Sequence, residues 1–97
     1  MEIEYHPAVR KDIREIVNYY DEQSDTAGDR FVDELHESIE RVRQNPTRFH
    51  LVDEKRRRCN LRKFPYHFIY DIRDENTIRI LLIRHPKRHP SFGMSRD

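Results

Sequence analysis

Two stretches of the chain repeat their apolar residues with the period of a helix. The first stripe consists of Val9, Ile13, Ile16, Val17 and Tyr20. The second consists of Phe31, Leu35, Ile39 and Val42. Positions spaced by three and four residues share one face of a helix, so each stripe predicts an amphipathic helix. Two such helices joined by a short link favour an antiparallel helical hairpin.

Proline and short polar side chains mark the ends of these predicted helices. Pro7 follows a short alternating segment, residues 2–5, and suits the first turn of a helix. The segment Ser24-Asp25-Thr26 offers side chains that can cap the start of the second helix. Pro46 restricts the residue before it and predicts the end of that helix.

The second half of the chain alternates with the period of strands. Strands are predicted for residues 2–5, 57–62, 66–72 and 77–83, with a turn over 73–76 between the last two. In the last strand the alternation places Ile78, Ile80 and Leu82 on one side. It places Leu81 and Ile83 on the other, and a strand that is apolar on both sides is usually interior to its sheet.

These elements predict an α+β protein with the order β-α-α-β-β-β. We expect an antiparallel sheet with the helical hairpin packed on one face. A length of 97 residues predicts one domain, residues 1–97. With 35% hydrophobic and 38% charged residues, the core must be small. A chain of this size buries a limited share of its surface, so we expect a partner to contribute to its stability.

Charge is distributed unevenly along the chain, although the net charge is only +1. Residues 1–54 hold 7 Lys/Arg against 14 Asp/Glu, a net charge of −7. Residues 55–97 hold 12 against 4, a net charge of +8. A basic, strand-rich half predicts a docking face for an anion or an acidic partner, supported by an acidic helical half.

The arginines of the basic half are the main candidates for binding, because a guanidinium grips phosphate or carboxylate bidentately. Tyrosine and phenylalanine lie between them and can stack on bases. The predicted partner-binding residues are Arg56, Arg58, Arg62, Lys63, Tyr66, Arg84 and Arg88. The alternative is a solvated sheet face whose arginines pair with the carboxylates of the helices.

His85 stands out among the histidines because it follows the predicted interior strand, where side chains emerge at the rim of a sheet. A neutral imidazole there can act as a base, whereas the alternative is a histidine that bonds a loop carbonyl. Cys59 falls on the predicted core side and is expected to be packing. No spacing predicts a metal site, and no cofactor is expected.

The sequence also argues against several classes of protein. Gly28 and Gly93 are the only glycines, too few for a phosphate-cradling loop. The longest apolar run, residues 80–83, is far too short to span a membrane, and the N-terminus lacks the pattern of a signal peptide. A single cysteine fits a reducing compartment, so we expect a cytoplasmic protein.

Several short motifs, taken in order, resemble the RelE/ParE superfamily of small bacterial toxins. The motifs are Pro7-Ala8, Asn45-Pro46, Arg62-Lys63-Phe64-Pro65-Tyr66, Ile69-Tyr70 and the closing His85-x-x-Arg88-x-Pro90-x-Phe92. The resemblance covers nearly the whole chain and lies closer to the ParE-like branch. It implies the toxin of a type II toxin–antitoxin (plasmid stabilisation) system, neutralised by a cognate antitoxin.

The resemblance implies two mechanisms. ParE-like members inhibit DNA gyrase by binding it, which is the mechanism we expect here. RelE-like members are metal-independent endonucleases that cut mRNA on the ribosome; in that case Arg62 and Arg84 would stabilise the phosphorane and His85 would move a proton. The chain ends without the tyrosine or histidine of several cleaving members. A third possibility is a degenerate, non-toxic module that binds only the antitoxin.

Overall fold

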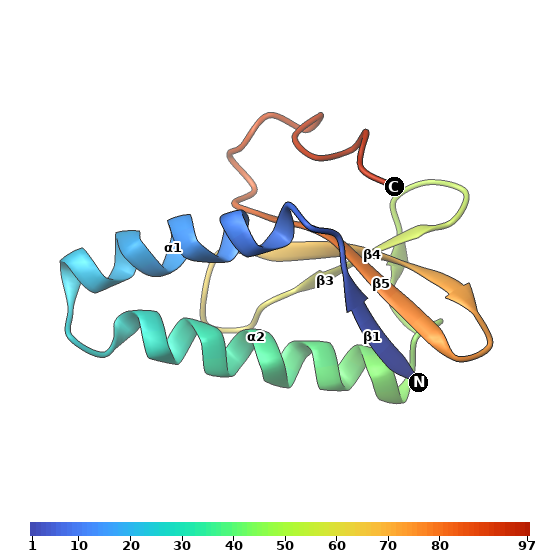
Figure 1. The fold of residues 1–97 in the computed structure, drawn as a ribbon, viewed down its shortest axis with the longest axis horizontal. Coiled ribbons are helices and arrows are strands. Elements are labelled where there is room, and N and C mark those ends of the chain that lie inside the picture. The colour runs from blue at the N-terminus through green and yellow to red at the C-terminus, as the bar shows by residue number, and fades with distance from the viewer.

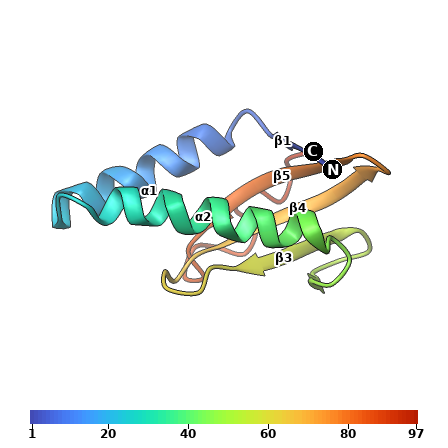
Figure 2. The same cartoon turned by 90° about the horizontal axis from the view of Figure 1, so that it is seen from below.

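The computed structural model describes all residues from Met1 to Asp97 and has two layers, a helical hairpin and a sheet (Figure 1). The strands are β1 (Glu2–Tyr5), β2 (His50–Leu51), β3 (Arg56–Asn60), β4 (His67–Asp74) and β5 (Thr77–Arg84). The helices are α1 (Val9–Gln23) and α2 (Ala27–Gln44). Both helices lie on the same side of the sheet (Figure 2). The α+β class and the helical hairpin are confirmed.

The sheet has the strand order β1-β5-β4-β3-β2. The long β4–β5 hairpin forms its centre, and β3 and β2 extend it in antiparallel fashion. At the other edge β1 runs parallel to β5, because the helical hairpin carries the chain back before the sheet continues. The sheet is therefore mixed, and the parallel edge is the one departure from an all-antiparallel arrangement. The two-residue strand β2 is also absent from the sequence-based expectation.

A β-bulge in β5 changes which side chains face the helices. Ile69 aligns with Leu82 but Tyr70 aligns with Ile80, so β5 has one extra residue at Leu81. Such an insertion shifts the alternation by one position. Leu81 and Leu82 consequently both lie on the face away from the helices, and Ile83 joins the main core. The strict alternation predicted from the sequence was wrong for Leu82 and Ile83 for this reason.

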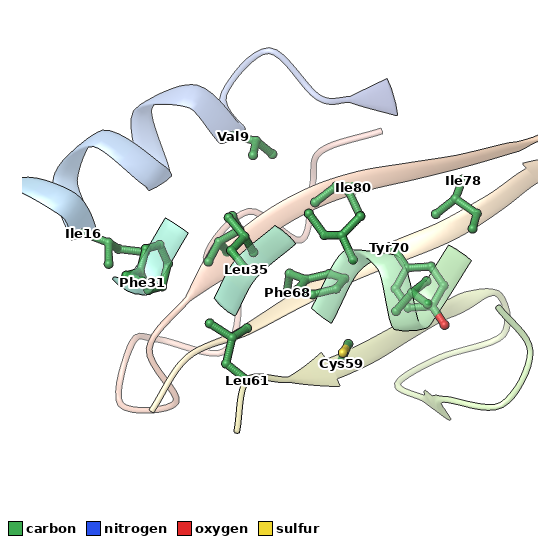
Figure 3. Close-up of a cluster of buried hydrophobic side chains, with 13 residues drawn as sticks. Val9, Ile16, Phe31, Leu35, Cys59, Leu61, Phe68, Tyr70, Ile78 and Ile80 are labelled. Carbon is green, nitrogen blue, oxygen red and sulfur yellow. The ribbon is translucent and has the colours of Figure 1, made fainter. Parts of the chain in front are cut away.

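The main core lies between the helices and the sheet (Figure 3). It contains 13 buried residues, with side chains from both helices and from β3, β4 and β5. Cys59 is among them, as expected. Tyr70 is fully buried, and its hydroxyl donates to the Pro46 carbonyl at 2.6 Å, which fixes the loop after α2 to the core.

The C-terminal tail, residues 85–97, runs past the edge of β5 next to α1, and Met94 lies on the face of the sheet away from the helices, which we call the outer face. Ile69, Leu81 and Leu82 form a small second core there, and Met94 of the tail packs against it. Gly93 has a φ of +71°, and a side-chain carbon added there would lie 2.8 Å from Leu82 Cδ2. Glycine therefore allows the tail to lie close to β5. Neither helix has the length and apolar character needed to cross a membrane.

Candidate partner-binding site

One end of the outer face, next to the β4–β5 turn, holds basic and acidic side chains that pair with one another. Arg56, Asp71 and Arg79 align across β3, β4 and β5, and Glu4 of β1 continues the row. Residues aligned in this way lie within reach of one another on one face of a sheet. We call this region the paired end; its ion pairs are Arg56–Asp53 at 2.6 Å, Arg73–Asp71 at 2.7 Å, Lys55–Asp71 at 3.9 Å and Arg79–Glu4 at 3.1 Å.

The opposite end of the outer face has no such pairing. Asn60, His67 and Arg84 form the last row across β3, β4 and β5, and Arg58 lies on β3 one row away. We call this region the unpaired end; it comprises Arg58, Arg62, Lys63, His67, Arg84, His85 and Arg88. None of its four arginines lies within 4.0 Å of a carboxylate oxygen.

Arg84 is partly buried, and all the groups that accept its hydrogen bonds are neutral. Its Nε donates to His67 Nε2 at 2.9 Å, and its Nη1 donates to the Pro90 and Phe92 carbonyls at 2.6 and 3.3 Å. Burial lowers the pKa of Arg84, and the neighbouring charge of Arg58 lowers it further. No carboxylate oxygen lies within 4.0 Å of this guanidinium to offset either effect.

His67 responds to the same environment. Its side chain is 6% exposed. Burial lowers its pKa to about 4, and the charges of Arg84, Arg58 and His85 act in the same direction. His67 is therefore neutral near pH 7, which is the form that can accept the hydrogen bond from Arg84.

Contacts with three arginines hold the tail on the sheet. Arg84 binds two tail carbonyls, and Arg56 Nη1 donates to the Met94 carbonyl at 2.6 Å. Arg96, from the tail itself, donates to both carboxylate oxygens of Asp12 on α1, at 2.6 and 3.1 Å. The tail is thus fixed to β3, β5 and α1 together.

The pair Asp12–Arg96 also completes the backbone hydrogen bonding of β5. Strand β1 pairs with β5 only as far as Ile80, so the next part of β5 lacks a neighbouring strand. There the Ile83 N–H donates to Asp12 Oδ2 at 3.1 Å, and Arg96 Nη1 donates to the Leu81 carbonyl at 3.1 Å. A buried ion pair takes the place of a strand, and it satisfies groups that would be costly to leave unbonded.

A cleft of about 210 Å³ opens where α1, the end of β5 and the tail meet. Its lining includes Tyr19 of α1, and Tyr66, His85, Arg88 and Phe92. Tyr66 and His85 contact each other edge to face, with ring centres 5.3 Å apart. The Lys87 N–H donates to His85 Nδ1 at 3.0 Å, so a neutral His85 carries its proton on Nε2.

A larger groove of about 580 Å³ lies between the start of α1 and the middle of α2. Tyr5, His6, Val9 and Leu35 are among its lining residues. It contains none of the residues predicted to bind a partner or to carry chemistry, so we place the candidate site at the unpaired end and its cleft.

The structure separates the predicted partner-binding residues into three groups. Tyr66, Arg84 and Arg88 line the cleft together with His85. Arg58, Arg62 and Lys63 form no ion pair, and Arg62 lies on the loop after β3 rather than within the strand. Arg56 belongs to the paired end, where Asp53 and the tail engage its guanidinium.

Two buried acids of the helices were missed by the sequence reasoning. Asp12 is 5% exposed, and Glu34, 8% exposed, accepts the backbone N–H of Lys63 at 2.9 and 3.0 Å. Glu34 thereby fixes the loop that carries Arg62 and Lys63 to α2. Both acids fall on the apolar stripes of their helices, and a polar residue on such a stripe is the signal that could have identified them.

The cysteine and the possible metal ligands add no further reactive group. Burial raises the pKa of the Cys59 thiol to about 11, so the thiol stays protonated near pH 7. The structure brings no three His, Cys, Asp or Glu side chains together in a way that could hold a metal ion.

Comparison with known proteins adds one match. Residues 3–90 match the profile of a family described as the ParE toxin of the type II toxin–antitoxin system parDE. No curated protein matches the chain. The matched segment begins within β1, contains both helices and the other four strands, and ends within the tail, at Pro90. The chain therefore belongs to the ParE toxin family of type II toxin–antitoxin systems.

Proposed function

We propose that this toxin inhibits bacterial growth by binding DNA gyrase in the cytoplasm, that it serves plasmid stabilisation, and that the unpaired end is its contact surface. Membership of the family gives the chain a toxin role and an antitoxin as partner. The proposed surface is supported by the contrast in ion pairing between the two ends of the outer face. Arginines at the paired end have acidic partners within the chain, whereas Arg58, Arg62, Arg84 and Arg88 have none.

Two features support binding rather than cleavage as the mode of action. Two of the three guanidinium nitrogens of Arg84, Nε and Nη1, already donate to His67 and to two tail carbonyls, so only Nη2 is free to stabilise a phosphorane and a bidentate grip would require it to leave them. His85 Nδ1 already accepts a backbone N–H, which leaves Nε2 as a donor. A general base needs a free acceptor within reach of the proton it abstracts.

Cleavage of mRNA on the ribosome is the second candidate. Arg84 and His85 line the same cleft, so two of the three residues proposed for that chemistry are close together. Arg62 lies outside the cleft lining, on the loop after β3. This candidate makes a different prediction for purified components and can be tested directly.

The first experiment is expression of the full chain with and without its antitoxin. Growth arrest only without the antitoxin supports a toxin, whereas unaffected growth would favour the non-toxic binding module. The purified chain is then tested for inhibition of gyrase supercoiling and, separately, for cutting of mRNA on translating ribosomes. Loss of supercoiling supports the proposal. Cleavage of mRNA with supercoiling unaffected would replace it with the second candidate.

A matched pair of variants tests the contact surface. Arg58→Gln/Arg62→Gln removes two unpaired cations of the unpaired end, and Lys11→Gln/Arg14→Gln removes two exposed cations of α1. Both change the net charge equally. We expect gyrase inhibition to weaken about tenfold in the first variant, as for the loss of about 1.4 kcal/mol of binding, and to stay unchanged in the second. Equal effects would point to overall charge rather than to this surface.

A further inference from the structure

The two helices lie close together at the turn that joins them and diverge toward the start of α1 (Figure 1, Figure 2). Gly28, near the start of α2, permits the close end, because a side-chain carbon there would meet Asp21 and lie 3.1 Å from Val17 Cγ1. Where the helices diverge, a groove of about 580 Å³ opens, and residues 5–7 of the β1–α1 connection form part of its wall. Sites for small ligands have volumes of about 300–1,000 Å³.

The floor of this groove is apolar and its rim is polar. Val9 and Leu35, each 1% exposed, form the floor. At the rim lie Arg10 and two histidines, His6 and His36. None of the eight lining residues is an acid. An apolar floor with a cation and imidazoles at the rim suits a ligand that has an apolar body and a negative group.

The imidazole of His6 is oriented to donate a hydrogen bond. Its Nδ1 accepts the Ala8 N–H at 3.0 Å, so a neutral His6 carries its proton on Nε2. Burial lowers the pKa of His6. Three arginines act in the same direction and one acid opposes them: Arg96, Arg79, Arg73 and Asp12. His6 is therefore neutral near pH 7, and its Nε2 remains as a donor for an anion.

The charges around the groove favour a ligand with a single negative group. Arg10 is exposed and has no carboxylate oxygen within 4.0 Å, so its charge is free to bind an anion. The exposed face of α2 near His36 carries the acids Asp33, Glu37 and Glu40, but none of them lines the groove. Glu40 is engaged in an ion pair within α2. Repulsion from the other two acids disfavours a dianion more than a monocarboxylate.

We propose that this groove binds a small organic acid with an apolar ring or short chain and one carboxylate. The apolar part lies on Val9 and Leu35, and Arg10 and the imidazoles of His6 and His36 bind the carboxylate. A small molecule fits better than a long peptide, because the helices converge at one end of the groove and the β1–α1 connection lies at the other. The proposal goes beyond the proposed function and is independent of it, since none of these residues belongs to the unpaired end.

The probe is 2-naphthoate, which has an aromatic body and one carboxylate. It is titrated into the ¹⁵N-labelled full chain and followed by ¹H–¹⁵N correlation spectra. We expect millimolar binding with shifts concentrated at the amides of His6, Arg10, Leu35 and His36.

Three related compounds separate the features of the probe. The amide 2-naphthamide keeps the rings without the charge, acetate keeps the charge without the rings, and 2-naphthyl phosphate adds a second charge. The first two should bind at least threefold more weakly, and the third should bind no more tightly. Equal shifts with acetate, tighter binding of the phosphate, or shifts scattered over the surface would each overturn the proposal.

Two arginines one turn apart on α1 provide a matched test of the charge. Arg10→Gln removes the cation of the groove, and Arg14→Gln removes an exposed cation that does not line it. We expect Arg10→Gln to weaken binding of 2-naphthoate at least threefold and Arg14→Gln to leave it unchanged. An equal loss in both variants would assign the effect to general electrostatics and contradict the proposal.

Two exposed histidines test the contribution of the imidazoles. His36 lines the groove, whereas His50 lies on β2 and does not. His36→Ala should weaken binding of 2-naphthoate about twofold, and His50→Ala should leave it unchanged. The same affinity in both variants would contradict the placement of the carboxylate beside His36.

Two other occupants of the groove are separate outcomes of the same spectra. A second copy of the chain would shift the groove amides on dilution without any ligand, whereas we expect no change over an about tenfold range of concentration. An antitoxin segment would shift these amides when the antitoxin is added, in a chain that does not bind 2-naphthoate. Either result would overturn the proposal.

These outcomes remain distinct from those of the proposed function. If 2-naphthoate fails to bind but the chain still arrests growth and inhibits gyrase, the toxin proposal stands and the groove proposal fails. If 2-naphthoate binds as described but growth and gyrase are unaffected, the groove proposal stands and the proposed target is rejected.

Discussion

The two ends of the outer face use the same residue type in opposite ways. At the paired end Asp53, Asp71 and Glu4 neutralise the arginines, whereas the unpaired end offers its arginines only neutral acceptors. Arginine density therefore does not distinguish a binding surface from a structural one. The difference lies in whether an acid is within reach, from the loop before β3, from the same strand or from a neighbouring strand. It accords with our proposal that the first end stabilises the sheet and the second binds partners.

The largest effect is expected where the fold depends on a buried ion pair. Asp12→Ala leaves Arg96, whose side chain is 15% exposed, without its counterion and the Ile83 N–H without an acceptor. We expect the free energy of unfolding, measured with urea, to fall by about 3–5 kcal/mol. Asp12→Asn keeps an acceptor oxygen and should lose less. Asp12→Ala/Arg96→Met should recover part of the loss, because both charges are then removed. A change below about 1 kcal/mol would contradict the role given to this pair.

The next effect concerns pH at the unpaired end. The pKa of His67 is about 4 in the folded protein and about 6.5 in the unfolded chain, so the unfolded state binds its proton first as the pH falls. This contribution to stability is complete above about pH 6.5 and is lost progressively down to about pH 4. We expect it to amount to about 3 kcal/mol. The free energy of unfolding is measured against pH for wild type and for His67→Gln across this range. If the two curves stay parallel, the pKa of His67 is not lowered by folding and the prediction is wrong.

Binding of the antitoxin tests whether the arginines of the unpaired end contribute to affinity rather than to stability. Arg58→Gln/Arg62→Gln should lower antitoxin affinity about tenfold, equivalent to about 1.4 kcal/mol, with the free energy of unfolding unchanged within about 0.5 kcal/mol. Affinity of the wild type should fall with added salt, since charges are screened over about 8 Å at physiological ionic strength. The variant should show a weaker salt dependence in isothermal titration. A salt-independent wild type would indicate apolar recognition instead.

The smallest effect compares one arginine from each end. Arg79→Gln removes an ion pair with Glu4 that is largely at the surface and should lower the free energy of unfolding by up to about 1 kcal/mol. Arg58→Gln removes a cation without a partner and should leave stability unchanged or slightly raised, because repulsion with Arg84 is relieved. Urea unfolding of both variants provides the measurement. A greater loss in Arg58→Gln than in Arg79→Gln would reverse the assignment of the two ends.

Periodicity was sufficient to predict most of the fold. The stripes of α1 and α2 and the alternation of β4 and β5 report local geometry that each segment adopts for itself. The bulge at Leu81 and the parallel pairing of β1 could not be predicted in this way. Both depend on which residue of a distant strand lies opposite, and no local pattern encodes that.

The candidate site was predictable in part. The closing motif indicated His85 and Arg88, and the structure places both in one cleft with Tyr66. Tyr19 was not predicted, because its position on α1 relates to that cleft only through the packing of the helix on β5. Arg56 and Arg84 show the opposite case: the sequence marks them as charged, and the structure shows that contacts within the chain engage them.

The sequence alone determined that this protein has two amphipathic helices, a strand-rich basic half and the motifs of its toxin family, because these features depend on residue type and short spacing. Only the tertiary structure decided which arginines are neutralised. Ion pairing depends on separations of a few ångströms between residues far apart in the chain, such as the 75 positions between Glu4 and Arg79 or the 84 between Asp12 and Arg96. Strand register and the path of the tail set those separations.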